Sequence, residues 1–328
     1  MDSNIITKNS HYIQQAYLKN FACNKKKTHI WEFDKYTNVI SDIPKKIKDV
    51  AKKDYFYPQW LEVWFNQNIE SDAIQVIRNF SFHKAVSKLK NYEKKILLDW
   101  IFIQLVRTVG FQNFIFQSLN TFFKQLENKK IQSIPSKVIQ KFIHSNYDLR
   151  KIPKYKSQFQ EILWNFMTNK NKFTNFVIKN HKWSIIENIT NYDYLTSDDP
   201  VIWHCYNTTT IPMELNLEWD GNNEVFNPNF INLEFHPSIS YQIPLSSKLL
   251  LLISNIDFKI QEFYYQGDIK HVIKMNELIT TRAYRYIFAE KRDFKHAFLT
   301  LDKFPESRFK PIKEINPKYM DLSIERIE

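Results

Sequence analysis

Glycine is scarce in this chain of 328 residues, which contains only Gly110, Gly221 and Gly267. A Walker A loop and a dinucleotide-binding fingerprint both need clustered glycines, because their backbone N–H groups must approach phosphate groups closely. The sequence therefore excludes P-loop nucleotide hydrolases and Rossmann dehydrogenases.

Cysteine is almost absent as well, since Cys23 and Cys205 are the only two thiols. Two cysteines so far apart form neither a secreted disulfide framework nor a zinc ribbon. The nine histidines are scattered, without the spacing of an HExxH motif. We expect a reduced, cytoplasmic protein without a zinc site.

No apolar run is long enough for a membrane span, which needs about 20 residues. The most apolar stretch, ILLDWIFIQLVRTVGF (96–111), is interrupted by Asp99, Gln104 and Arg107. The first residues, MDSNIITKNS, lack the basic and apolar regions of a signal peptide. We therefore interpret residues 96–111 as a buried core helix and expect no contact with a membrane.

Apolar and aromatic residues make up 43% and 16% of the chain, which is enough for a large folded core. Neither a Gly/Ser-rich linker nor an internal repeat divides the sequence, so we predict one α+β domain over 1–328. It has a helical N-terminal and middle part, with helices over about 60–182. A β-rich C-terminal third follows over about 183–291, and then an extended tail over 304–328. The alternating stretch 28–40 predicts a β-hairpin.

Charge is distributed unevenly. Residues 183–247 contain nine acids and neither Lys nor Arg, so this window carries −9. Because the whole chain carries +11, the remainder carries +20. A basic body favours a nucleic-acid partner, although a Lys-rich composition also simply keeps a protein soluble. The acidic window predicts either a divalent-cation site or a solvated sheet edge.

Two polar residues interrupt the predicted core helix. Gln104 and Arg107 are three apart and share one helix face. A buried arginine is costly unless a carboxylate or a phosphate pairs with it. Glu70, in the predicted helix NIESDAI, is a plausible partner, and equally a metal ligand or a general base.

Two carboxylates stand together in YLTSDDPVIW (194–203). Asp199 precedes Pro200 and is therefore extended, so its side chain and that of Asp198 point to opposite faces. We expect one of them to face inward. Thr196 and Ser197 are suited to closing a local turn here.

A histidine opens the stretch HYIQQAYLKNFA (11–22), just before a predicted short helix. A neutral imidazole at His11 can accept a proton near neutral pH. The alternative is that His11 only caps the helix.

Five motifs carry a family resemblance: HYIQQAYLKNF, IESDAI, FIQLVRT, YLTSDDPV and YQIPLSS. In this order they resemble the bacterial family catalogued as domain of unknown function 4238. That family has an N-terminal H-Y-V-P-Q-F-Y-L-[RK]-N-F motif, a helix with a Glu and a Q-x-x-R-T core helix. A T-S-D-N-P-V turn then precedes an F-P-L-S-P strand. The resemblance covers roughly residues 10–290.

Three positions depart from the family pattern. Gln14 stands where the family has a proline that is pre-organised for a helix start. Asp199 replaces an asparagine, which favours Asp198 as the functional acid, and Ser247 replaces the second proline of the strand motif.

The resemblance implies that its polar residues meet in one site, because no local structure requires them. The predicted catalytic residues are His11, Glu70, Arg107 and Asp198. The predicted substrate-binding residues are Tyr12, Gln15, Gln104 and Ser197. Glu70 and Asp198 are also the predicted ligands of Mg²⁺, the candidate cofactor.

The leading functional hypothesis is a nuclease that cleaves phosphodiester bonds in RNA or DNA, as a toxin-like effector in phage defence. His11 would be the general acid or base and Arg107 would hold the phosphate. The alternatives are a non-enzymatic module that binds nucleic acid or protein, and a nucleotide-dependent transferase such as an ADP-ribosyltransferase. An enzyme should hold the polar set in a concave pocket, whereas a binding module should seal it and carry a basic stripe elsewhere.

Overall fold

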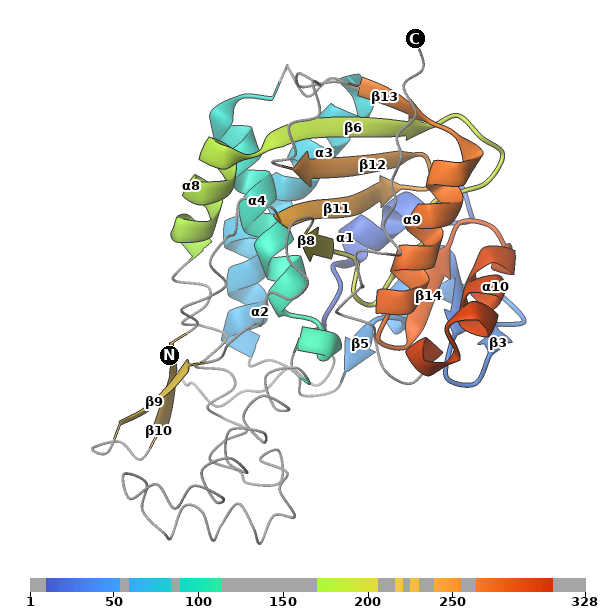
Figure 1. Cartoon of the computed structure of the whole chain (residues 1–328), viewed down its shortest axis with the longest axis horizontal. Helices are drawn as coiled ribbons and strands as arrows, with labels where there is room; N and C mark the ends of the chain where they lie inside the picture. Colours follow the sequence, from blue (N-terminus) through green and yellow to red (C-terminus); the bar gives the residue numbers. More distant parts are fainter. Residues whose placement is uncertain are drawn as a thin grey trace, which may run out of the picture.

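The computed structural model describes residues 10–53, 59–83, 89–111, 113, 170–205, 216–220, 225–229, 239–254 and 264–308. These residues form a mixed α+β structure, in agreement with the predicted class (Figure 1). None of the helices described is both long enough and apolar enough to cross a membrane.

A five-stranded sheet lies at the centre, with the order β13-β6-β12-β11-β8. Its neighbouring strands are antiparallel, except that β13 runs parallel to β6. The strands are β6 (Lys182–Asn188), β8 (Ile202–Cys205), β11 (Ile239–Ser246), β12 (Leu249–Ser254) and β13 (Tyr264–Gly267).

Strand β12 explains why the sheet is covered on both faces. Its sequence LLLLIS is buried throughout, which is typical of a strand with protein on each side. Leu251 and Ile253 belong to one hydrophobic cluster, and Leu250 and Leu252 to another. Side chains that alternate along a strand point to opposite faces, so the two clusters lie on opposite sides of the sheet.

The first cluster joins the sheet to the helices of the N-terminal half. Helix α4 is buried on all sides from Leu97 to Val106, as the sequence predicts for a core helix. In Figure 1, α4 and α8 lie beside one end of β6, β12 and β11. These helices are α1 (Gln15–Leu18), α2 (Gln59–Phe65), α3 (Ser71–His83), α4 (Asn91–Val106) and α8 (Lys170–Asn180).

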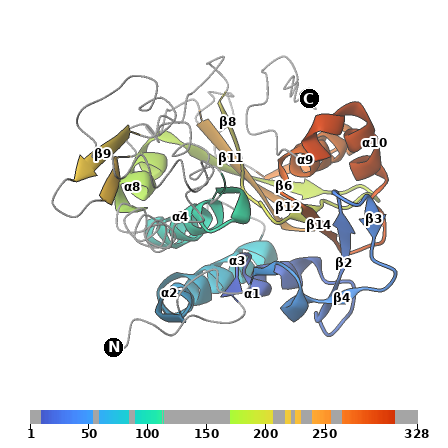
Figure 2. The same ribbon diagram turned by 90° about the horizontal axis from the view of Figure 1, so that it is seen from below.

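The second cluster is completed by helices α9 (Ile269–Arg282) and α10 (Lys295–Lys303). Helix α9 is amphipathic, and Val272 and Met275 belong to the face that packs into this cluster. Figure 2 shows α9 and α10 on the side of the strands away from α2 and α3.

A second sheet has the order β3-β2-β14-β7, and β4 also pairs with β2. It joins the predicted N-terminal hairpin, formed by β2 and β3, to strands from the C-terminal half. Two further pairs of strands, β1 with β5 and β9 with β10, stand apart from both sheets. These strands are β1 (Ser10–His11), β2 (His29–Asp34), β3 (Val39–Ile40), β4 (Lys45–Lys46), β5 (Lys52–Lys53), β7 (Thr196–Ser197), β9 (Asn216–Asp220), β10 (Val225–Asn229) and β14 (Tyr286–Ala289).

Three finer predictions have different outcomes. The N-terminal part is not mainly helical, because residues 10–53 form five short strands beside α1 and the 3-10 turns at Lys19–Phe21 and Ile47–Asp49. The predicted extended tail is wrong at its start, where Pro305–Arg308 form a 3-10 helix and Ser307 is buried. Residues 309–328 lie outside the described part.

The β-rich C-terminal third stays a prediction. Strands β6 to β14 fall within it, but so does α9, and several intervening segments are not described.

Candidate functional site

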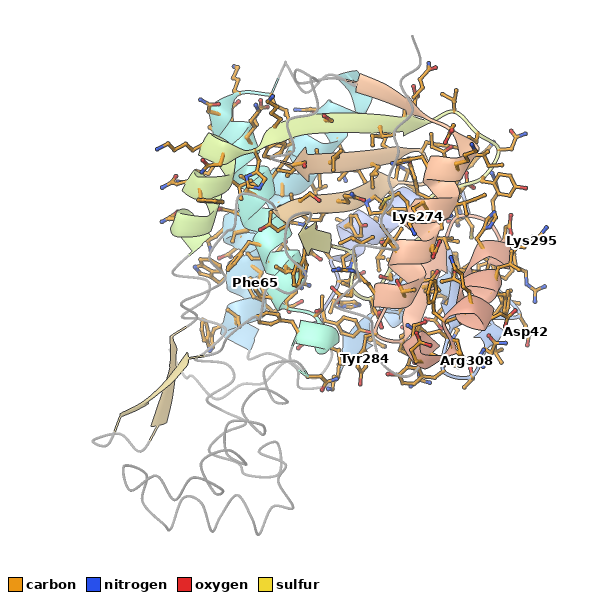
Figure 3. The ribbon with its side chains drawn as sticks, viewed as in Figure 1. Asp42, Phe65, Lys274, Tyr284, Lys295 and Arg308 are labelled. Atoms are coloured by element: carbon orange, nitrogen blue, oxygen red, sulfur yellow. The ribbon has the colours of Figure 1, made fainter. Side chains whose placement is uncertain are left out.

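Arg107 is the centre of the polar set, at the end of α4, with 1% of its surface exposed. Its Nε donates to the carbonyl oxygen of Tyr12 at 3.0 Å, and one terminal nitrogen donates to the carbonyl oxygen of His11. The other terminal nitrogen forms an ion pair with Glu70. The guanidinium also lies over the ring of Phe65, 5.4 Å from its centroid, at the end of α2 (Figure 3). All three guanidinium nitrogens are therefore bound within the protein.

A π-helical turn, Asn66–Glu70, positions Glu70 between α2 and α3. Such single turns insert an extra residue into a helix and are frequent at functional sites. Glu70 is 8% exposed, so its charge depends on the pairing with Arg107. The sequence predicted this pairing but not the π turn.

Gln14 fills the position at which the family has proline. Its Oε1 accepts from Trp100 Nε1 at 2.9 Å, and its Nε2 donates to the carbonyl oxygen of Glu70 at 3.2 Å. The glutamine therefore ties the N-terminal segment both to α4 and to the π turn. Sequence reasoning treated this position only as a lost proline.

His11 is half-buried at the edge of the set. Its Nε2 lies 3.1 Å from the carbonyl oxygen of Lys48, and its Nδ1 lies 3.4 Å from Nε2 of Gln15. Because the first is an acceptor and the second a donor, the contacts fit a neutral imidazole with its proton on Nε2. Burial lowers the pKa of His11, and the positive charge of Arg107 lowers it further.

Glu62 on α2 is a site residue that sequence reasoning missed. Its carboxylate accepts from the backbone N–H of His11, and burial raises its pKa while Arg107 lowers it. An acid within the apolar helix QWLEVWF was the available signal. Two carboxylates, Glu62 and Glu70, therefore lie close enough to Arg107 to feel its charge.

Asp198 lies elsewhere, in a buried turn with 1% of its surface exposed. Its carboxylate accepts from the backbone N–H groups of Tyr284, Arg285 and Tyr286 at 2.8, 2.8 and 2.9 Å. Tyr284 is labelled in Figure 3, in the turn after α9. Burial raises the pKa of Asp198 to about 7, although the hydrogen bonds from Tyr286 and Arg285 lower it.

Tyr12 connects Asp198 to the Arg107 set. Its backbone oxygen accepts from Arg107, and its pKa is raised well above the ordinary value by burial and then by the charge of Asp198. His11, Tyr12, Gln15, Glu70 and Arg107 thus form one connected group, and Asp198 reaches it only through the field at Tyr12.

Lys35 is a second residue that the sequence did not reveal, fully buried behind Asp198. Its Nζ donates to the carbonyl oxygens of Thr280 and Ala283 at 3.1 and 2.6 Å, at the C-terminal end of α9. Burial lowers the pKa of Lys35 to about 8, against the charges of Asp198 and Asp199. Only one aspartate was expected to face inward, but Asp199 is buried as well.

The predicted turn at Ser197 is present. Its hydroxyl donates to the carbonyl oxygen of Asp199 at 2.9 Å and accepts from the backbone N–H of Asp199 at 3.2 Å. Thr196 Oγ1 lies 2.8 Å from the hydroxyl of Tyr17, which donates to the carbonyl oxygen of Pro244. Ser197, a predicted substrate-binding residue, therefore uses its hydroxyl to hold its own turn.

Gln104 is fully buried on α4, and within the described part of the chain its side-chain amide makes no hydrogen bond. It shares a helix face with Trp100 and Arg107, which bind the N-terminal segment. The structure brings Gln104 next to the group but gives it no exposed surface.

The predicted Mg²⁺ ligands do not fit a metal ion. Both oxygens of Asp198 already accept from backbone N–H groups, and Glu70 binds Arg107. Among the residues that the structure describes, no three His, Cys, Asp or Glu side chains are grouped to hold a metal.

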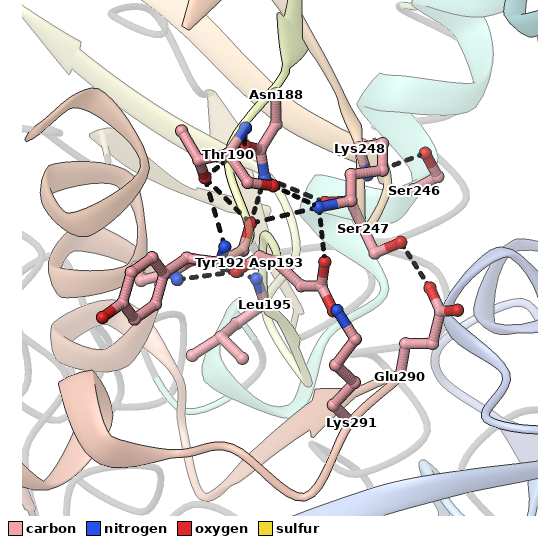
Figure 4. A network of polar contacts seen from close by, with 11 residues as sticks. Asn188, Thr190, Tyr192, Asp193, Leu195, Ser246, Ser247, Lys248, Glu290 and Lys291 are labelled. Carbon is pink, nitrogen blue, oxygen red and sulfur yellow. Dashed lines mark hydrogen bonds and ion pairs between the residues drawn. The ribbon is translucent and has the colours of Figure 1, made fainter. Parts of the chain in front are cut away.

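A polar network at the end of β6 accounts for another acid of the negative window (Figure 4). Asp193 receives Lys248 Nζ and Lys291 Nζ, each at 2.8 Å. Ser247, where the family has proline, donates its hydroxyl to Glu290. These acids serve structural ion pairs and hydrogen bonds at this point.

Five exposed lysines surround His11. We call them the basic cluster: Lys45, Lys46, Lys48, Lys52 and Lys53. His11 pairs with Lys52 in the β1–β5 ladder and contacts the carbonyl oxygen of Lys48.

Acids in the described part of the chain balance only two of these lysines, Lys45 with Glu32 at 3.0 Å and Lys52 with Asp49 at 3.4 Å. The half-buried imidazole of His11 therefore borders a positively charged surface.

The family model described as "Protein of unknown function (DUF4238)" matches residues 9–293. The chain belongs to this family. The DUF4238 match covers all five motifs and thus confirms the resemblance seen in the sequence. No curated protein and no solved structure matches the chain.

Proposed function

We propose that this DUF4238 protein binds nucleic acid through the phosphate backbone, with the basic cluster as the contact surface. The observation that carries the proposal is the set of five exposed lysines on β4, β5 and the turn between them. Lysine side chains neutralise phosphates and release counterions, which gives affinity without reading the base sequence. The net charge of +11 adds long-range attraction for a polyanion.

The burial of the polar set supports binding rather than catalysis. Arg107, at 1% exposure, has no guanidinium nitrogen left for a phosphate. Its bonds to His11 and Tyr12 instead hold β1 in place against α4. The buried group thus acts as a support for the exposed lysines, which is the arrangement expected of a binding module.

The test is fluorescence anisotropy with labelled RNA and DNA at several salt concentrations. We compare wild type with Lys46→Gln/Lys48→Gln and with the matched control Lys270→Gln/Lys295→Gln, which removes two exposed charges from α9 and α10. Each lost phosphate contact should reduce the slope of log K against log salt by about 0.9. Equal effects of the two variants, or binding that does not change with salt, would remove the proposal.

Phosphodiester cleavage is the second candidate, and His11 is the observation that favours it. Its lowered pKa keeps the imidazole neutral at neutral pH, and it borders the basic cluster. Nδ1 is the nitrogen that can accept a proton, once it gives up its long contact with Gln15.

Labelled RNA and DNA incubated with Mg²⁺, Mn²⁺ or EDTA, beside a His11→Ala variant, test this candidate. Cleavage that is lost in the variant would establish it, whereas intact substrate in all conditions would leave binding alone. The hypotheses of a phage-defence effector and of an ADP-ribosyltransferase stay predictions.

A further inference from the structure

Helix α2 exposes a large aromatic side chain next to the basic cluster. Trp60 is 40% exposed and Val63, three residues later, is 44% exposed. Residues three apart lie on the same helix face, so the two form one outward apolar surface. Tryptophan is normally among the more buried residues, which makes this exposure informative.

The chain of contacts from Trp60 to the lysines is short. Glu62, two residues after Trp60, accepts from the backbone N–H of His11. His11 in turn pairs with Lys52 on β5. Two helical residues rise by about 3 Å, so Trp60 and Lys52 lie on elements that both contact His11 directly.

We infer that the nucleic acid bound at the basic cluster is single-stranded, and that Trp60 stacks on one of its bases. This inference rests on the proposed function and deepens it. Single strands offer the open π-faces of their bases, and aromatic side chains beside a basic surface bind them without sequence preference. A duplex hides these faces between its base pairs and would meet only the lysines.

Charge and shape together favour this occupant over a protein partner. The surface beside Trp60 is strongly positive, because Lys46 and Lys48 make no ion pair with any residue that the structure describes. A chain that alternates phosphates and flat apolar rings matches lysines and an indole placed side by side.

The first experiment compares a labelled single-stranded oligonucleotide with a duplex of the same sequence, using RNA and DNA. Wild type should bind the single strand more tightly. Trp60→Ala should weaken single-strand binding by about tenfold, the effect of losing one stacked base. Trp60→Phe should restore most of it, and the salt slope should stay unchanged in both variants.

Tyr92→Ala is the matched control, since Tyr92 is a 58% exposed aromatic at the start of α4. It should bind like wild type. Quenching of tryptophan fluorescence by the oligonucleotide should also be reduced in Trp60→Phe, and thermal unfolding shows whether each variant is folded.

The outcomes separate this inference from the proposed function. If neither nucleic acid shows salt-dependent binding, the proposed function is wrong. If Lys46→Gln/Lys48→Gln weakens binding but Trp60→Ala does not, or if the duplex binds equally well, only the single-strand inference is overturned.

Discussion

Glu70 and Arg107 form an ion pair between the π-helical turn and the end of α4, and both side chains are buried. The pair joins two helices and, through the other guanidinium nitrogens, the backbone of the N-terminal strand. Its removal should therefore affect stability before it affects any ligand.

Arg107→Met should destabilise the protein by about 3–5 kcal/mol, because it leaves the buried charge of Glu70 unpaired. The double variant Arg107→Met/Glu70→Met should lose less, since no buried charge remains. Urea unfolding measures both, with exposed Lys295→Gln as control. Equal losses in the single and double variants would contradict a role for the pair.

Gln14→Pro would restore the family residue at a position whose backbone suits proline, with φ at −61°. We nevertheless expect a loss of about 1–3 kcal/mol, because the variant leaves Trp100 Nε1 and the Glu70 carbonyl oxygen unpaired. In a Trp100→Phe background the cost should shrink. A stabilised Gln14→Pro variant, measured by thermal unfolding, would show that the side-chain contacts contribute little.

Asp198 should make stability depend on pH. Its folded pKa of about 7 lies above the unfolded value of about 3.9, so between these limits the folded state binds more protons. Its contribution is present below about pH 4 and is lost as the pH rises to about 7, by up to about 1.4 kcal/mol per pH unit.

Chemical unfolding at pH 4 to 8 tests this expectation. Relative to Asp198→Asn, which cannot titrate, wild type should lose stability with rising pH and then level off. The exposed Asp302→Asn should keep the wild-type slope. Parallel curves for wild type and Asp198→Asn would show that Asp198 is ionised throughout this range.

Gly267 should not tolerate a side chain. A Cβ there would lie 2.9 Å from Ile186 Cγ2 and 3.1 Å from the hydroxyl oxygen of Tyr194, which contacts His271 Nδ1 at 3.0 Å. Gly267→Ala should therefore cost about 1–3 kcal/mol by overpacking. The exposed neighbour provides the control, Gln266→Ala, and a thermal shift no larger than the control's would refute the expected clash.

Local patterns predicted several elements, because their causes are close in sequence. The hairpin at 28–40, the core helix beginning at Asn91 and the Arg107–Glu70 pairing all follow from periodicity or from the cost of a buried charge. The predicted long helix ends earlier than expected, at Val106, and its predicted continuation towards residue 128 falls mostly outside the described part.

Other features were hidden because they depend on distant partners. Asp198 receives its donors from residues 284–286, and Lys35 binds the end of α9 almost 250 residues away. Glu62 joins the site only because a strand that precedes it by about 50 residues passes beside α2. No window of sequence contains these pairs, so composition and spacing could not reveal them.

The pairing of β2 with β14 has a consequence for how the chain is made. Phe33 lies opposite Ile287, so the second sheet cannot close until the ribosome has synthesised nearly the whole chain. Contacts of such long sequence separation also form slowly, because the loop between them must first be closed. The N-terminal segment that carries His11 is therefore among the first residues made and among the last to be locked in place.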